Sequence, residues 1–195
     1  RQPRLADLDA WAEFMADPET AVPVGGVQPR PTVWRGLATM VGAWAMNGFG
    51  MFSVFEKSSG QWVGRIGPWS PEGWPGTEVG WGVLRRCWGR GYATEGAIAA
   101  IDWAFANLGW TEVIHTIALD NAASQAVARR LGSAPLRTAQ LPAPFPESSP
   151  ARSVNSPCSR ATPCTSRMRC ARRDCQSTFT TRRDVSAIFR SSPRR

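Results

Sequence analysis

A pair of glycines stands where the sequence changes from a strand pattern to a helix pattern. The segment 85–96 reads RRCWGRGYATEG, with Gly89 and Gly91 one residue apart and Arg86 and Arg90 beside them. Glycine lets the backbone turn tightly and approach a ligand without a Cβ atom in the way. The first amides of the following helix have no intrahelical partner, and the helix dipole makes that end positive. This arrangement predicts an anion site suited to a diphosphate.

The same glycines also fit a plain turn between a strand and a helix, and a bare Gly-x-Gly pair favours that interpretation. The neighbouring arginines and the strand-then-helix setting favour the anion site instead. The loop is not a Walker P-loop, because no Gly-Lys-Ser/Thr sequence follows it. It is not a dinucleotide fingerprint, because only two glycines are present and the helix comes late in the chain.

Hydrophobic periodicity around this loop predicts a mixed α+β domain with one sheet flanked by helices. Apolar residues recur at helical spacing in some segments, and other segments are short runs rich in strand-forming residues. The predicted helices are 4–17, 31–46, 91–109 and 121–132, and the predicted strands are 50–57, 61–69, 77–84 and 111–119. Asn121, at the start of the last helix, is a typical N-cap residue.

The glycine loop and the segments after it resemble the GNAT N-acetyltransferases. The residues that carry the resemblance are Arg86-x-x-Gly89-x-Gly91-Tyr92-Ala93-Thr94-Glu95, then Asp120-Asn121-Ala122-Ala123-Ser124 and Arg130-Leu131-Gly132. The likeness is closest to the ribosomal-protein N-terminal (Rim-type) branch and extends over residues 1–146. It implies a mixed, mostly antiparallel sheet, acetyl-CoA as the acetyl donor, and a primary amine as the acceptor. The amine belongs to a peptide N-terminus or to a small molecule.

The resemblance also implies how the coenzyme is bound. By this resemblance the diphosphate lies on the amides of residues 87–93, and the pantetheine arm lies between strands 77–84 and 112–118 like an additional strand. The implied cofactor-binding residues are Val83, Arg86, Trp88, Gly89, Arg90, Gly91, Tyr92, Ala93, Thr94 and Asn121. Two parts of the family pattern are missing. The first strand is cut off or reduced to residues 1–3, and no convincing strand text follows LPAPF at 141–145.

Acetyl transfer to an amine requires a base for the amine and a proton for the leaving thiolate. Glu78, in the strand before the loop, is the first candidate for the base, acting through water. The alternative is a strand-end carboxylate paired with an arginine. His115, the single histidine, is a second candidate base, although strand histidines are more often packed or hydrogen-bonded. Ser124 stands where related enzymes place a residue that protonates the thiolate. Trp69 and Trp74 are candidates for the wall of an acceptor pocket.

The residues from 147 onward differ in composition from the rest of the chain. They carry the whole net charge of +8, as arginine, together with four of the five cysteines. This composition predicts a disordered tail over 147–195, after an acetyl-CoA-binding domain over 1–146. The tail is either a natural basic extension or the translation of a shifted reading frame. The cysteine spacing does not match a zinc site, so no metal is predicted, and nothing supports a disulfide framework.

Two other functions remain as alternatives. One is a damaged or catalytically silent CoA-binding protein, because both ends of the fold look incomplete. The other is nucleic-acid binding through the arginine-rich tail, since residues 1–146 carry no net charge and offer no basic face. The sequence shows no membrane-spanning run and no secretory signal, which predicts a cytoplasmic protein without a membrane partner. The patterns indicate no particular oligomeric state.

Overall fold

The computed structural model describes residues 1–142 and 152–156. In chain order its elements are η1 (Leu5–Asp7), α1 (Leu8–Ala16), α2 (Pro18–Ala21), η2 (Val22–Val24), α3 (Arg30–Asn47), β1 (Phe52–Phe55), β2 (Trp62–Trp69), β3 (Glu78–Val83), η3 (Arg85–Cys87), α4 (Tyr92–Asn107), β4 (His115–Ala118), α5 (Ala122–Arg130), β5 (Ala134–Ala139) and β6 (Arg152–Ser156). This order confirms the predicted mixed α+β class and every helix and strand that the periodicity predicts. None of the described helices is long and apolar enough to cross a membrane.

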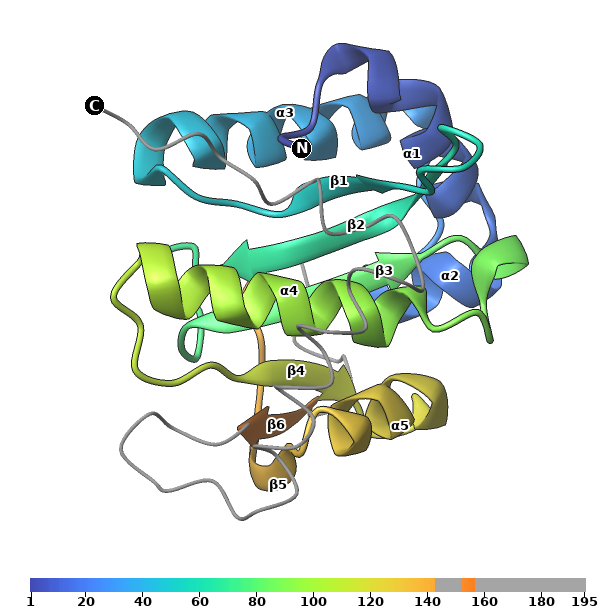
Figure 1. Cartoon of the computed structure of the whole chain (residues 1–195). Helices are drawn as coiled ribbons and strands as arrows, with labels where there is room; N and C mark the ends of the chain where they lie inside the picture. Colours follow the sequence, from blue (N-terminus) through green and yellow to red (C-terminus); the bar gives the residue numbers. More distant parts are fainter. Residues whose placement is uncertain (143–151, 157–195) are drawn as a thin grey trace.

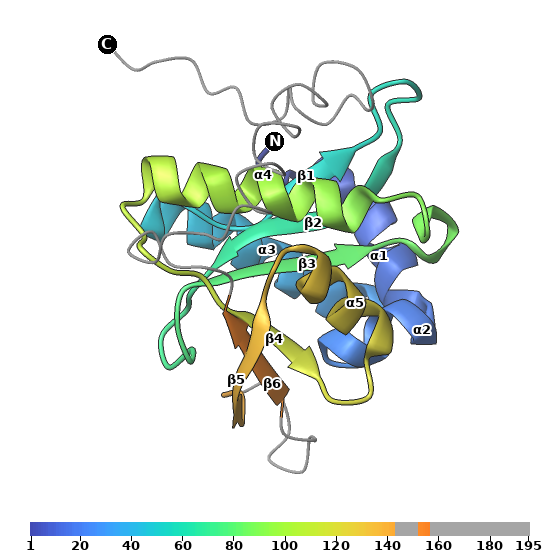
Figure 2. The same ribbon diagram turned by 60° about the horizontal axis from the view of Figure 1, so that its bottom comes forward.

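Strands β1, β2 and β3 form an antiparallel sheet in chain order, with helices on both faces. Figures 1 and 2 show α4 along one face and α1 and α3 on the other. The core between these layers contains fully buried Phe14, Val54, Ile66 and Val79. Gly96 lets α4 approach the sheet closely, because a Cβ atom there would lie only 2.5 Å from the Cδ1 atom of Ile66.

The first residue of the chain extends this sheet. The Ser53 amide donates to the Arg1 carbonyl at 2.9 Å, and the Arg1 amino group donates to the Ser53 carbonyl at 3.2 Å. Asp7 holds the segment in place by accepting bonds from the Arg1 guanidinium and, at 2.8 Å, from the Ser53 hydroxyl. Residues 1–3, where the first strand was expected to be cut off or reduced, form no strand, but Arg1 pairs with β1 through Ser53.

A second sheet has the order β4-β6-β5, with β6 antiparallel to both neighbours (Figure 2). Here the prediction that no strand follows residues 141–145 is wrong, because β6 lies within the predicted tail. The sequence also gave no indication of β5. The reason is physical: five of the six residues of β5 are exposed, and β6 contains one apolar residue, so neither segment shows hydrophobic alternation. The other tail residues, with the four cysteines, lie outside the described part of the chain.

The two sheets meet at a single parallel bridge between β3 and the segment before β4. The Ile114 amide donates to the Thr77 carbonyl at 2.8 Å, and the Val79 amide donates to the Ile114 carbonyl at 3.1 Å. Beyond this bridge β3 and β4 do not pair with each other: β3 pairs with β2, and β4 pairs with β6. Backbone N–H and C=O groups alternate in direction along a strand. The backbone groups of Trp81 and Val83 therefore point the same way as those of Val79, into the opening between β3 and β4.

Candidate functional site

The glycine loop has the backbone geometry that its sequence predicts. Gly89 and Gly91 have φ angles of +72° and +86°, in the left-handed region that favours glycine. The first hydrogen bond of α4 is donated by the Glu95 amide to the Gly91 carbonyl, at 3.0 Å. Among the described residues, the amides of Ala93 and Thr94 have no acceptor. These donors and the positive end of the helix dipole together form a site for an anion.

The two arginines of the loop do not point into this site. The Arg86 guanidinium pairs with Glu13 of α1, and the Arg90 guanidinium pairs with Glu56 at 2.5 Å. Glu56 also accepts a bond from the Tyr92 hydroxyl, and burial together with Glu56 raises the pKa of Tyr92 to about 12. Arg86 and Arg90, which were expected to add positive charge to the anion site, therefore pair with carboxylates outside it, and their role in binding the cofactor stays a prediction. Exposed ion pairs contribute only about 0–1 kcal/mol, so either arginine can exchange its partner for a bound anion.

A cavity of about 770 Å³ runs from this loop into the opening between β3 and β4. It brings together most of the predicted site residues: Glu78, Val83, Trp88, Gly89, Gly91, Tyr92, Ala93, Thr94, His115, Asn121 and Ser124. Arg86 and Arg90 are the predicted site residues that do not line it. The Trp88 indole Nε1 donates a hydrogen bond to the Val83 carbonyl at 2.8 Å, so this carbonyl is already occupied as an acceptor.

Glu78 lies at the point where the strands separate, and its side chain is 5% exposed. Its Oε1 accepts bonds from the Thr116 amide at 3.1 Å and from the Thr116 hydroxyl at 2.9 Å. Its Oε2 accepts a bond from the Trp74 indole at 2.5 Å. The carboxylate therefore joins β3, β4 and the loop before β3 while it lines the cavity.

His115 is buried beside the opening and packs against Trp81, with ring centroids 4.8 Å apart. Its Nδ1 lies 2.6 Å from the Val79 carbonyl, which requires the proton to be on Nδ1 in the neutral ring. Burial lowers the pKa of His115 to about 4. His115 is therefore a weaker base than an ordinary histidine, which counts against its expected role as a second candidate base. Its buried Nε2 has no partner among the described residues and remains a hydrogen-bond acceptor.

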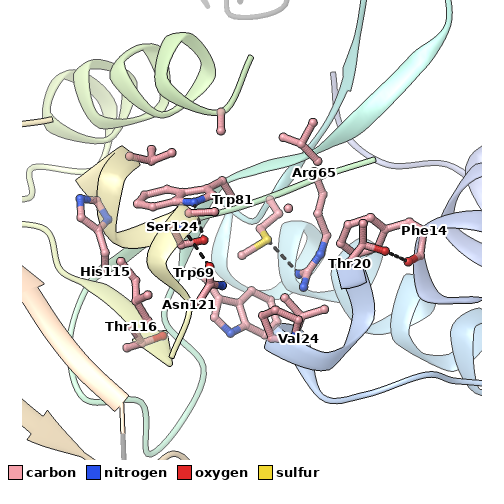
Figure 3. A pocket seen from close by; sticks show the side chains of 18 of the residues that line it. Phe14, Thr20, Val24, Arg65, Trp69, Trp81, His115, Thr116, Asn121 and Ser124 are labelled. Carbon is pink, nitrogen blue, oxygen red and sulfur yellow. Dashed lines mark hydrogen bonds between the residues drawn. The ribbon is translucent and has the colours of Figure 1, made fainter. Parts of the chain in front are cut away.

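Asn121 caps α5 as predicted, because its Oδ1 accepts a bond from the Ser124 amide at 3.0 Å. The cap places the Ser124 side chain at the start of the helix and beside the opening, where its hydroxyl lies 3.3 Å from the Trp81 indole nitrogen. Figure 3 shows Ser124, Trp81 and His115 together on one side of the cavity. The hydroxyl accepts from the indole and keeps its own proton available for donation.

The opposite side of the cavity contains a residue that the sequence reasoning missed. Figure 3 shows Arg65, from β2, beside Phe14 and Thr20. Trp69 and Trp74, the two tryptophans expected to wall an acceptor pocket, line the same cavity, with ring centroids 6.5 Å apart. One signal for Arg65 was available, since it is the single charged residue in the otherwise uncharged strand QWVGRIGPW. Thr116, the partner of Glu78, carried no such signal.

Comparison with known proteins agrees with the loop motif. The acetyltransferase (GNAT) domain model matches residues 1–134, so the chain belongs to the GNAT acetyltransferase family. A solved acetyltransferase from Agrobacterium tumefaciens is 31% identical, with a TM-score of 0.68 over 80% of this chain and 87% of its own. The FsC-acetyl coenzyme A-N(2)-transacetylase of Aspergillus fumigatus is 37% identical over 102 residues, 46% of this chain and 43% of the relative.

The predicted likeness to the Rim-type branch is also found among solved structures. The ribosomal-protein-S5-alanine acetyltransferase of Vibrio fischeri is 16% identical, with a TM-score of 0.61 over 84% of this chain and 94% of its own. At that identity the likeness is one of fold. The chain spans about half the length of the curated relatives it matches.

Proposed function

We propose that this protein is an N-acetyltransferase that transfers the acetyl group of acetyl-CoA directly to a primary amine. The observation that carries the proposal is one cavity that joins two features. At one end are amides at the start of α4 without an acceptor among the described residues, and at the other is the buried carboxylate of Glu78. The first feature suits a diphosphate, and the second suits a reacting amine.

The residues along the cavity fit a coenzyme that enters between β3 and β4. Of the amides of residues 87–93 that were expected to hold the diphosphate, those of Cys87 and Trp88 donate to the Leu84 and Arg85 carbonyls, so the amides of residues 89–94 hold it instead. Arg86 or Arg90 joins after release from its surface pair. The backbone groups of Trp81 and the Val83 amide, which face the opening, pair with the amide groups of the pantetheine arm, while the Val83 carbonyl already accepts a bond from the Trp88 indole. Asn121 lies on the other side of that arm. The unpartnered Nε2 of His115 supports this fit, because a buried acceptor is stabilised by a donor that the arm supplies.

The proposed reaction is a single displacement at the thioester carbon. Glu78, through a water molecule, removes a proton from the acceptor ammonium group and leaves a neutral amine. The amine nitrogen then forms the new C–N bond as the C–S bond breaks. Ser124 donates its proton to the thiolate of CoA and takes up the second amine proton through water, so that its hydroxyl is restored. His115 is a poor acceptor for these protons, because burial lowers its pKa to about 4; it positions Trp81 and the Val79 carbonyl instead.

A thiol-release assay tests the proposed function directly. The purified chain is mixed with acetyl-CoA and a panel of amines that contains peptides with free N-termini, amino acids, a polyamine and an aminoglycoside. The proposal predicts release of CoA thiol that depends on an amine, together with an equal amount of N-acetylated product by mass spectrometry. Thiol release at the same rate without any amine would contradict it.

A further inference from the structure

Arg65 points into the cavity on the face of the sheet opposite α4. In the β2–β3 register, Arg65 lies opposite Gly82, and Trp69 lies opposite Glu78. Residues opposite each other, and residues four apart along a strand, share a face, so Arg65 and Glu78 both face the α1 side of the sheet. Its guanidinium carbon lies 5.4 Å from the ring centre of Trp11.

The guanidinium group of Arg65 has no anionic hydrogen-bond partner among the residues that the structure describes. Its one hydrogen-bond contact to a described residue is to the Met51 sulfur at 3.0 Å, a weak acceptor, and its buried Nε has none. It forms no ion pair with any described residue, unlike the surface arginines 30, 85, 86 and 90. Burial lowers the pKa of Arg65 to about 10, and the Glu78 carboxylate acts in the opposite direction. The group is therefore charged at neutral pH and incompletely solvated.

A charge held in this way is costly unless something pairs with it. Stacking on Trp11 and Phe14 offsets part of the cost but leaves the in-plane N–H donors without acceptors. Those donors match a carboxylate, which accepts two parallel bonds from the guanidinium fork. A phosphate has the same oxygen spacing but carries more charge, and the Glu78 carboxylate in the same cavity repels it more strongly.

We propose that Arg65 binds a carboxylate of the acetyl acceptor, so that the acceptor is a molecule with both an amine and a carboxylate. This inference rests on the proposed function, with the amine at Glu78. Trp69 lies opposite Glu78 in the β2–β3 register, and Arg65 is four residues from Trp69 on the same strand. The Cα atoms of Arg65 and Trp69 are therefore about 13 Å apart. The preferred acceptor therefore has its amine and carboxylate separated by several bonds, and the indoles of Trp69 and Trp74 cover the chain between them.

Binding of matched probes tests this inference without turnover. Straight-chain ω-amino acids from glycine to aminooctanoate, and their carboxamides, are titrated by calorimetry into the full chain in the presence of CoA. We expect each longer acid to bind at least about tenfold more tightly than its amide, because the amide cannot pair with the fork. Arg65→Met should reduce that preference to within about twofold, and Arg65→Lys should give an intermediate value. Arg35→Met, on the exposed face of α3, is the matched control and should retain the full preference.

Three results would overturn the role of Arg65. They are equal binding of acid and amide by the wild type, an unchanged preference in Arg65→Met, and tighter binding of the matching aminoalkyl phosphate than of the acid. A lower affinity of Arg65→Met for CoA itself would also contradict it. The same probes in the thiol-release assay separate the two proposals. A wild type that prefers the acids but acetylates none of them contradicts the proposed function and leaves the carboxylate site standing.

Discussion

Glu78 joins three segments of the chain through one carboxylate, and the proposed chemistry depends on it more than on any other side chain. Its oxygens accept bonds from Thr116 and Trp74, so the carboxylate is fixed in position before any acceptor arrives. A positioned base of this kind typically contributes about 10²–10⁴-fold to the rate. If Glu78 only joined β3 to β4, it would contribute to stability and not to the rate. The two roles therefore predict different effects of substituting Glu78.

Replacing Glu78 by Gln should lower kcat by about 10²–10³-fold, because the amide cannot take up the proton. Acetyl-CoA affinity should change little, since the diphosphate site lies at the other end of the cavity. Thr116→Val is the matched control: it removes the hydroxyl that holds Glu78 but keeps the backbone amide donor and the carboxylate. Steady-state thiol release measures both variants. A kcat for Glu78→Gln equal to that of Thr116→Val would assign Glu78 a structural role.

The second prediction for a single residue concerns pH. In the folded chain the pKa of His115 is about 4, against 6.5 when unperturbed. The unfolded chain therefore binds a proton at His115 from about pH 6.5 downward, while the folded chain does not until about pH 4. Stability should consequently fall as the pH falls through this window, by about 2 kcal/mol between pH 7 and pH 5.

Urea unfolding at pH 7 and pH 5 measures this loss. His115→Asn is the control, because its side-chain amide can still donate to the Val79 carbonyl but does not titrate. His115 is the single histidine, so the variant should lose the part of the pH dependence that His115 contributes. The part that comes from the Arg1 amino group, whose pKa burial lowers to about 5, should remain in both proteins. An equal loss in both proteins would show that another group is responsible.

At the scale of elements, β6 is the strand that completes the second sheet. Its register includes four residue pairs with β4 and five with β5. A chain that ends at Pro146 loses β6, whereas a chain that ends at Ser156 keeps it. Cross-strand pairs contribute roughly 0.2–1 kcal/mol each, so the shorter chain should be less stable by about 2 kcal/mol or more. That loss corresponds to a melting temperature at least about 4 °C lower.

Thermal melts followed by circular dichroism compare the two truncated chains. Acetyl-CoA binding provides the second readout, since β4 forms one side of the opening that holds the pantetheine arm in the proposed function. Equal melting temperatures and equal affinities would mean that β6 contributes nothing to the fold or to the site.

The elements that the sequence predicted are those that bury a regular apolar face. Ile98, Ile101 and Phe105 mark α4, and its start at Gly91 follows from the glycines, because φ there is positive. Asn121 identified the start of α5 because an N-cap depends on a local hydrogen bond. β5 and β6 were missed because their pairing uses backbone hydrogen bonds between distant segments, which leave no period in side-chain polarity.

In the site, too, features that depend on local sequence were predictable, and features that depend on distant residues were not. The amides at the loop follow from local geometry, and most of the residues around Gly89 that were predicted to bind the cofactor line the cavity. That they bind it stays a prediction. The partners of Arg86 and Arg90 are Glu13 and Glu56, which lie far away in the sequence, and no local pattern indicated them. The low pKa of His115 arises from burial, a property of the complete fold.

At the scale of the whole molecule, two sheets separate after one bridge, and α4 begins at the mouth of the resulting cavity. The proposed enzyme depends on this arrangement, because the coenzyme must reach both the α4 amides and Glu78. Gly89 allows a direct test. Its φ is +72°, and a Cβ atom added there would meet nothing within 4 Å. Gly48, at the end of α3, has a φ of +73° and equally open space around an added Cβ. The same substitution at both positions therefore introduces the same strain and the same charge.

Calorimetric titration of acetyl-CoA into Gly89→Glu and Gly48→Glu tests the central claim. The diphosphate of the coenzyme is expected on the amides beside residue 89, where a carboxylate repels it and competes for the same donors. Gly89→Glu should therefore bind acetyl-CoA at least about tenfold more weakly than the wild type, a change of about 1.4 kcal/mol. Gly48→Glu should bind within about twofold of the wild type. Equal affinities in the two variants would contradict the coenzyme site at the start of α4.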